Sequence, residues 1–146
     1  MLFIDNGVRT DNPLKGNDIM LINATAAPSV KGQVITTSTT VAGGYRAVPL
    51  DIPIPVGIVA ESGVPVGIPT RIITNGIADV LFVGSTTMNN FARTMLTADA
   101  GAAEGLAIAE TSPTTPFATD KHFMEIGHVS ETRTGAGLAK VILHFN

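Results

Sequence analysis

The stretch 71–83 constrains the fold more than any other part of the chain. Two runs rich in β-branched and aliphatic residues, 71–74 and 77–83, flank the dipeptide Asn75-Gly76. Asn-Gly favours positive φ at both central positions of a type I′ turn, which joins two antiparallel strands. The pattern therefore predicts a two-residue β-hairpin within a mostly β fold.

Further strand signals lie on both sides of this stretch. The runs 19–22, 32–37 and 140–146 combine β-branched or aliphatic residues with flanking turn residues. Residues 48–56 alternate aliphatic residues with prolines, which cannot donate to a central ladder. We expect an edge strand or an extended crossover there, and a terminal strand docked in the sheet.

Helical signals are weak. Residues 88–96 place Phe91 and Met95 four apart behind asparagines that could cap a helix, so one short helix is possible there. The predicted fold class is mostly β: a compact antiparallel β-barrel or β-sandwich-like domain over residues 19–146, with at most one short helix. Residues 1–18 are expected to form an extended N-terminal arm, and a first strand tucked into the core is the alternative.

The composition favours an assembled protein. Charged residues make up 14% of the 146 residues, against about 25% in an ordinary soluble domain. Much of the surface is therefore uncharged, which suits faces covered by neighbouring subunits. The net charge of -3 and the scattered lysines and arginines argue against nucleic-acid binding, and no apolar run approaches the length that spans a bilayer. The chain has no cysteine, so stability must come from packing or assembly.

One sequence pattern occurs twice. Residues 56–62 read aliphatic, Gly, any, Val, small, Glu, hydroxyl, and residues 126–132 repeat that order. In each copy a Gly-containing link leads to a basic residue and two aliphatic residues, at 71–73 and 140–142. We interpret each copy as a hairpin-like pair of strands, and chance similarity in a Gly- and Val-rich chain is the alternative.

Antiparallel counting gives each copy a register. It places a glutamate opposite a basic residue and a valine opposite an isoleucine: Glu61 opposite Arg71 and Val59 opposite Ile73, then Glu131 opposite Lys140 and Val129 opposite Ile142. Such cross-strand pairs contribute about 0.2–1 kcal/mol each. We expect Glu61, Arg71, Glu131 and Lys140 to form register-setting ion pairs rather than to act as catalytic carboxylates with basic partners.

The C-terminal part of the chain resembles a known family. Residues 122–132 and 134–145, together with the earlier copy at 57–61, are similar to the strand signature of capsid decoration (cement) proteins of tailed bacteriophages. The resemblance implies a structural protein on the outer capsid surface of the virion, often a trimer near local threefold axes, that strengthens the shell. Its partners would be the major capsid protein and further copies of itself. We expect the arm to contact the capsid through Leu2, Phe3, Ile4, Val8 and Arg9.

No residue pattern predicts catalysis, a cofactor or a metal site. The spacing of His122, His128 and His144 with Glu125 fits no usual zinc pattern. A β-rich run follows the Gly135-Ala136-Gly137 segment, where a phosphate loop would require a helix. We therefore expect a protein without enzymatic activity.

Two other function classes remain as alternatives. A tail- or fibre-associated module that recognises a glycan or receptor would need exposed aromatic residues, and the chain has one Tyr and no Trp. A β-rich enzyme would need a pocket with perturbed titratable groups.

Overall fold

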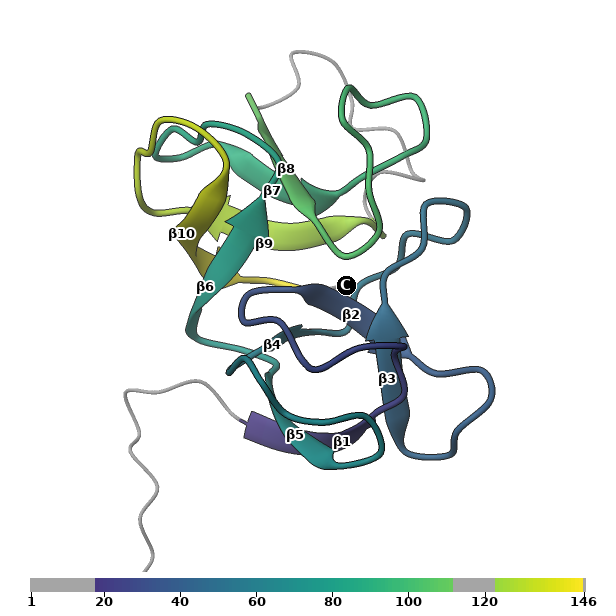
Figure 1. Cartoon of the computed structure of the whole chain (residues 1–146). Coiled ribbons are helices and arrows are strands. Elements are labelled where there is room, and N and C mark those ends of the chain that lie inside the picture. The colour runs from purple at the N-terminus through teal and green to yellow at the C-terminus, as the bar shows by residue number, and fades with distance from the viewer. Residues whose placement is uncertain (1–17, 112–122, 146) are drawn as a thin grey trace, which may run out of the picture.

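The computed structural model describes residues 18–111 and 123–145. They form ten strands, and this part of the chain contains no helix and hence none that could cross a membrane. The strands build two closed five-stranded barrels that lie against each other (Figure 1). The mostly β prediction is confirmed.

The first barrel contains β1 (Asp18–Asn23), β2 (Val34–Thr37), β3 (Gly44–Ala47), β4 (Gly57–Val59) and β5 (Pro69–Ile73). The second contains β6 (Ile77–Phe82), β7 (Phe91–Thr94), β8 (Ala107–Glu110), β9 (Glu125–Val129) and β10 (Gly137–Leu143). The terminal strand β10 pairs with both β6 and β9, so it is docked in the sheet as predicted. Residues 48–56 contain no strand and form the crossover from β3 to β4.

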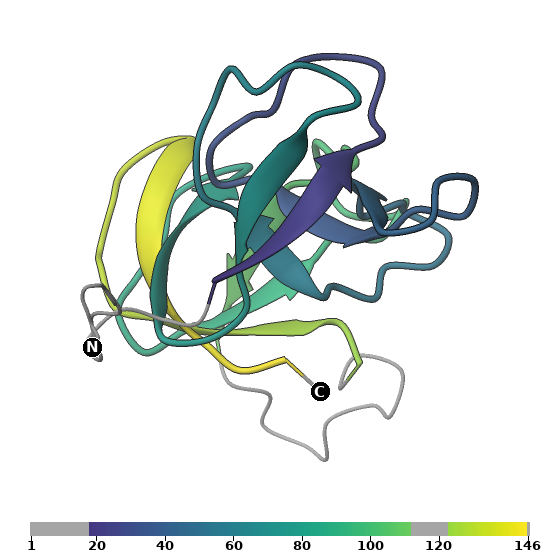
Figure 2. The ribbon, with the colours of Figure 1, turned by 90° about the horizontal axis from the view of Figure 1, so that it is seen from below.

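The two barrels are copies of one topology. The strand order is β1-β3-β2-β4-β5 in the first and β6-β8-β7-β9-β10 in the second, and each barrel closes on itself. Each contains one parallel pair, β1 with β3 and β6 with β8, and its other pairs are antiparallel. Figure 2 shows the first barrel in front, with β1 and β5 side by side.

The ladder registers of the two barrels also correspond. Equivalent facing pairs are Asp18↔Ile73 and Ile77↔Ile142, Val34↔Ile58 and Phe91↔His128, Ile35↔Ala47 and Ala92↔Ala109, Val59↔Ile72 and Val129↔Val141, and Asn23↔Tyr45 and Phe82↔Ala107. The sequence pattern that occurs twice is therefore the clearest trace of an internal repeat that includes all ten strands.

Alternation along the strands separates an interior from an outer face. In β6, Ala78, Val80 and Phe82 are buried and the residues between them are not, as period-two geometry requires. The interior of the first barrel holds residues from four strands: Ile35, Tyr45, Val59 and Ile72.

A second, larger cluster joins the two barrels. Val34, Val48 and Ile58 belong to the first barrel, yet they pack with the core of the second. At Val34 and Ile58, strands β2 and β4 are therefore buried on both faces. One face lies inside the first barrel, and the other packs against the second barrel. The barrels share a hydrophobic core and form one structural unit.

The hairpin predicted at Asn75-Gly76 is wrong. Strands β5 and β6 flank this dipeptide but belong to different barrels and do not pair with each other. Gly76 has φ of 84°, whereas Asn89 is the only described non-glycine residue with positive φ, so Asn75 does not adopt the geometry of a type I′ turn. The dipeptide instead carries the chain from one barrel into the next.

The short helix considered for residues 88–96 is absent. Phe91–Thr94 is strand β7, between β8 and β9. Asn89 lies in a turn with φ of 72°, where its backbone N–H donates to the Val129 carbonyl at 2.9 Å. Tertiary pairing outweighs the weak helical pattern here.

The predicted register is wrong by one residue in both copies. Val59 faces Ile72, and Val129 faces Val141. All four side chains are at most 2% exposed, whereas Ile142, the partner predicted for Val129, is 51% exposed. A slip of one residue would turn this buried set toward solvent, so burial sets the register and the charges do not.

Candidate functional site

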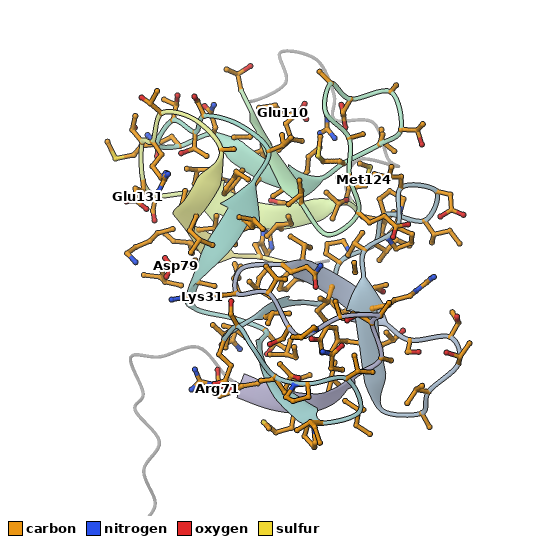
Figure 3. The ribbon with its side chains drawn as sticks, viewed as in Figure 1. Lys31, Arg71, Asp79, Glu110, Met124 and Glu131 are labelled. Atoms are coloured by element: carbon orange, nitrogen blue, oxygen red, sulfur yellow. The ribbon has the colours of Figure 1, made fainter. Side chains whose placement is uncertain are left out.

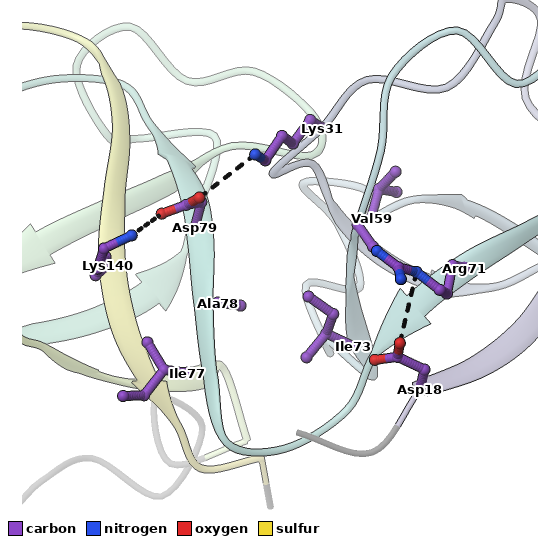
Figure 4. A pocket seen from close by; sticks show the side chains of 10 residues that line it. Asp18, Lys31, Val59, Arg71, Ile73, Ile77, Ala78, Asp79 and Lys140 are labelled. Atoms are coloured by element: carbon purple, nitrogen blue, oxygen red, sulfur yellow. Dashed lines mark hydrogen bonds and ion pairs between the residues drawn. The ribbon is translucent and has the colours of Figure 1, made fainter. Parts of the chain in front are cut away.

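A concave feature lies between the two barrels. A groove of about 300 Å³ is bounded on one side by β6 and β10 and on the other by β1, β4 and β5 (Figure 4). Its apolar lining includes Val59, Ile73, Ile77 and Ala78, and its charged lining consists of Asp18, Lys31, Arg71, Asp79 and Lys140. Figure 3 shows Lys31, Asp79 and Arg71 along the same side of the molecule.

Asp79 connects two lysines across this groove. Its carboxylate lies 3.0 Å from Nζ of Lys140 on the neighbouring strand and 3.5 Å from Nζ of Lys31 in the first barrel. Burial opposes ionisation of Asp79, but the hydrogen bond from Lys140 and the charges of both lysines outweigh it and lower its pKa. The same hydrogen bond and charge raise the pKa of Lys140.

The second charged pair is Arg71 with Asp18, whose Nε and Oδ2 atoms lie 3.5 Å apart. Each carboxylate of the groove therefore faces a cation, an arrangement that stabilises the charged forms of both groups. The lowered pKa of Asp79 is the opposite of the raised pKa expected for a carboxyl group that acts as a general acid or base near neutral pH. The lining of the groove thus combines apolar side chains with two sets of paired charges.

The predicted register-setting residues are only partly brought together. Arg71 and Lys140 both line the groove, but Arg71 pairs with Asp18 and not with Glu61. The carboxylate of Glu131 accepts a hydrogen bond from the backbone N–H of Lys140 at 3.0 Å, while the Lys140 ammonium pairs with Asp79. The Glu61–Arg71 pair was thus wrongly predicted, and the Glu131–Lys140 contact involves the backbone of Lys140 in place of its side chain.

The hydroxyl residue at the end of each sequence copy has a structural role that the sequence did not reveal. Its hydroxyl accepts a hydrogen bond from a backbone N–H in the turn that precedes β2 or β7. Ser62 accepts from Lys31 at 2.8 Å, and Thr132 accepts from Met88 at 3.1 Å. In both barrels a buried hydroxyl also donates to the carbonyl of the repeated glutamate, Ser29 to Glu61 and Thr86 to Glu131, each at 2.7 Å. The repeated pattern therefore fixes two equivalent turns.

A buried ion cluster in the second barrel was also missed. Arg93 donates two hydrogen bonds to the carboxylate of Asp99 at 2.9 and 3.0 Å, and its Nε lies 3.0 Å from Oε1 of Glu110. The Arg93 side chain is 5% exposed; burial opposes its charge, but the two carboxylates more than compensate and raise its pKa. No spacing rule links these three residues, because β7, β8 and the loop between them meet only in the folded chain. The cluster ties that loop to its strands.

The two described histidines, His128 and His144, make separate contacts. The ring of His128 lies 5.1 Å from that of Phe91, and Nδ1 of His144 lies 3.5 Å from the buried carboxylate of Glu125. Within residues 18–111 and 123–145, no group of three or more His, Asp or Glu side chains is placed to hold a metal ion. His122 and the predicted capsid-contact residues Leu2, Phe3, Ile4, Val8 and Arg9 lie outside the described residues.

The outer surface of the described residues carries exposed hydrophobic side chains. Twelve large hydrophobic side chains in the described part are between 38% and 58% exposed. They include Ile52 and Ile54 in the crossover, Met20 on β1, and Ile77 and Ile142, which face each other across β6 and β10. Exposed apolar residues indicate a surface that associates with other molecules where they form a large contiguous patch.

The sequence matches no known protein-family model, and no curated protein is detectably similar to it.

Proposed function

We propose that this chain is a structural virion protein that decorates the outer surface of a phage capsid and stabilises it by binding major capsid subunits. The observation that carries the proposal is the apolar, sparsely charged outer surface on a rigid double barrel. The resemblance of residues 122–145 to capsid decoration proteins gives the surface a specific partner. The protein acts without enzymatic activity and as a homo-oligomer, with the trimer as the form that the resemblance implies.

The mechanism is the addition of buried area. A protein interface of ordinary size removes about 800 Å² from each partner, and repetition over a closed shell multiplies its effect. Two barrels that share a core form a rigid unit, so little conformational entropy is lost when the unit is fixed on the shell. Each bound copy then opposes separation of the capsid subunits that it bridges.

Co-sedimentation with capsids tests this proposal. The purified chain should bind shells assembled from the major capsid protein saturably and at a fixed ratio, and it should raise the temperature at which they open. Deletion of residues 2–12 should lower occupancy while the circular dichroism spectrum of the barrels stays unchanged. Absence of saturable binding would reject the capsid role.

A glycan array run with the same protein distinguishes the main alternative. The capsid proposal expects no specific signal, whereas reproducible binding to a defined glycan would favour a tail- or fibre-associated module.

A further inference from the structure

A second cavity lies between the two barrels, beside β2 and β3, and we call it the Arg46 pocket. It has a volume of about 270 Å³ and shares no lining residue with the groove described above. The first barrel lines it with β3, the start of β2 and the loop after β1, and the second barrel lines it with Glu104. The apolar part of the lining consists of small side chains: Ala26, Ala27, Pro28, Val30, Ala47 and Pro49.

The wall that follows β1 is held in place by a buried side chain. Asn23 is fully buried, and its amide donates to the carbonyls of Ala27 and Val64, each at 3.0 Å. Its Oδ1 accepts the Thr25 N–H at 2.9 Å. A buried polar group whose hydrogen bonds are all made holds the segments that it joins. This wall of the Arg46 pocket is therefore formed before any ligand binds.

The wall from the second barrel is held by its backbone. The Gly105 N–H donates to the Val48 carbonyl at 3.0 Å, and the Gly105 carbonyl accepts the Val34 N–H at 2.8 Å. Gly105 has φ of 78°, and a Cβ atom there would lie 2.8 Å from Cγ of Gln33. Glycine thus permits this close approach of the two barrels. The approach fixes the neighbouring Glu104 at the edge of the pocket.

The guanidinium of Arg46 lines the pocket without a partner. Arg46 lies on β3 and is partly buried. Among residues 18–111 and 123–145 it has no side-chain hydrogen bond or ion pair, and its Nε is shielded from solvent with no acceptor. Partial burial removes hydration from a cation, and a donor without an acceptor costs free energy. A bound anion that reaches the terminal nitrogens would recover part of this cost.

The repeat shows that the barrel itself does not require an arginine here. Thr36↔Arg46 and Arg93↔Ile108 are equivalent facing pairs, so Ile108 occupies the position of Arg46 in the second barrel. The arginine of that second pair, Arg93, is bonded to two carboxylates, whereas Arg46 has none. Neither the fold nor an internal ion pair accounts for the charge of Arg46, and a ligand does.

Two more polar side chains line the pocket and make no bond within the described part of the chain, the Gln33 amide and the Glu104 carboxylate. Gln33 is partly buried and can donate to an anion beside Arg46. Glu104 is exposed and hence well hydrated, so it gains less from a partner than Arg46 does. Its charge repels a second negative charge on any ligand that Arg46 holds.

We propose that the Arg46 pocket binds an organic monocarboxylate with a small apolar body. The planar guanidinium of Arg46 pairs with the carboxylate through two parallel hydrogen bonds, and the alanine and proline side chains contact the body. A dianion would bring its second charge toward Glu104, and the lining offers no second cation. The proposal does not depend on the capsid role.

The size of the pocket limits the ligand further. Small-molecule sites have volumes of about 300–1,000 Å³, and this pocket lies just below that range. It therefore suits a short branched acid or one acidic side chain of a protein, and it excludes a nucleotide. Both sources present the same group, a carboxylate next to a small apolar chain.

Nuclear magnetic resonance titrations of the full-length chain test the proposal with one probe for each source. The first is 3-methylbutanoate, with the uncharged 3-methylbutanamide as its control. The second is the capped peptide acetyl-Ala-Val-Glu-Val-Ala-amide, with Gln in place of Glu as its control. At least one acid should saturably shift the amide signals of Ala27, Gln33 and Glu104, and its uncharged control should bind about tenfold more weakly or less. Binding of the peptide alone indicates a protein segment, and binding of the free acid indicates a small-molecule site.

Substitutions assign the binding to Arg46. Arg46→Met should weaken it about 10–100-fold, because it removes a charge-assisted pair, while the circular dichroism spectrum and the urea midpoint stay unchanged. Ala27→Trp should also abolish binding, since the ring fills the pocket while Arg46 is retained. Arg133→Met is the matched control: Arg133 is likewise partly buried with an Nε that lacks an acceptor, but it lies outside this pocket and its loss should leave the affinity unchanged.

Glu104→Gln provides a readout of opposite sign. It removes the repelling charge and should tighten binding of the acid, most clearly at low ionic strength. Absence of saturable binding by both acids would overturn the proposal. Equal affinities of the wild type and Arg46→Met, or weaker binding to Glu104→Gln, would overturn it as well.

Discussion

The two barrels offer a matched experiment at Gly57 and Gly127, which occupy equivalent positions on β4 and β9. A Cβ atom on Gly127 would overlap the carbonyl oxygen of Ile142 and lie 2.9 Å from its carbonyl carbon and 3.0 Å from Cα of Leu143. A Cβ atom on Gly57 would instead overlap a side-chain methyl group, Cγ2 of Ile72. The same substitution therefore meets backbone in one barrel and side chain in the other.

These contacts predict different losses of stability. Gly57→Ala overpacks a buried site and should lower the free energy of unfolding by about 1–3 kcal/mol. Gly127→Ala can be accommodated only if β9 moves away from β10, because the overlapped atoms are backbone. That movement adds the loss of ladder hydrogen bonds, such as the Ser130 N–H to the Lys140 carbonyl, each contributing about 1 kcal/mol. We expect a total of about 4 kcal/mol or more for Gly127→Ala.

Urea unfolding followed by far-ultraviolet circular dichroism measures both losses, since the chain has no tryptophan to report by fluorescence. Gly84→Ala is the control, because a Cβ at Gly84 would meet nothing within 4 Å, and it should stay within about 0.5 kcal/mol of the wild type. If Gly127→Ala is no more costly than Gly57→Ala, the close approach of β9 to β10 is wrong.

Three further predictions follow from buried or charged contacts. Arg93→Met leaves two partly buried carboxylates without their cation and should cost about 3–5 kcal/mol in urea unfolding; a loss below 1 kcal/mol would contradict the role of the cluster. Ile58→Ala should lower the free energy of unfolding by about 2–5 kcal/mol, because Ile58 lies between the barrels. The equivalent substitution His128→Ala should lower it by less than about 0.5 kcal/mol. Both are measured by urea unfolding at concentrations where the chain is monomeric. Asp79→Asn should cost less than about 1 kcal/mol at pH 7. Folding lowers the pKa of Asp79, so the stabilisation from its charge is present above the unfolded-state pKa and is lost as the pH falls through the folded-state pKa. The free energies of unfolding of Asp79→Asn and of the wild type should therefore converge in acid. A difference that persists in acid would refute this assignment.

Local sequence patterns predicted the strands well where period-two alternation coincides with burial. The run 19–22 lies within β1, and most of the runs 32–37 and 77–83 lies on β2 and β6, because β-branched residues suit a half-buried pleated surface. The prolines at 48–56 predicted an edge strand or an extended crossover, and the structure has the crossover. The helical pattern at 88–96 failed because two neighbouring strands pair with Phe91–Thr94.

The candidate site was less predictable from the sequence. Arg71 and Lys140 were singled out as charged strand residues, but the side chain of Arg71 pairs with Asp18 in place of Glu61, and the ammonium of Lys140 pairs with Asp79 while Glu131 binds the Lys140 backbone. Their partners Asp18 and Asp79 lie on strands β1 and β6, which join β5 and β10 only when each barrel closes. The Arg93 cluster was invisible for the same reason, since ion pairs of this kind depend on which segments meet in space.

The sequence by itself determined that the chain is built from strands and that its segments 56–73 and 126–142 share one pattern, because both properties reside in local residue order. Only the tertiary structure decided that this pattern belongs to two complete five-stranded barrels, that Asn75-Gly76 passes from one to the other, and that burial sets each register. It alone decided that Ile58 is buried while the equivalent His128 is exposed. That difference has a physical cause: Ile58 and His128 occupy equivalent strand positions, but only the first has a second barrel packed against it.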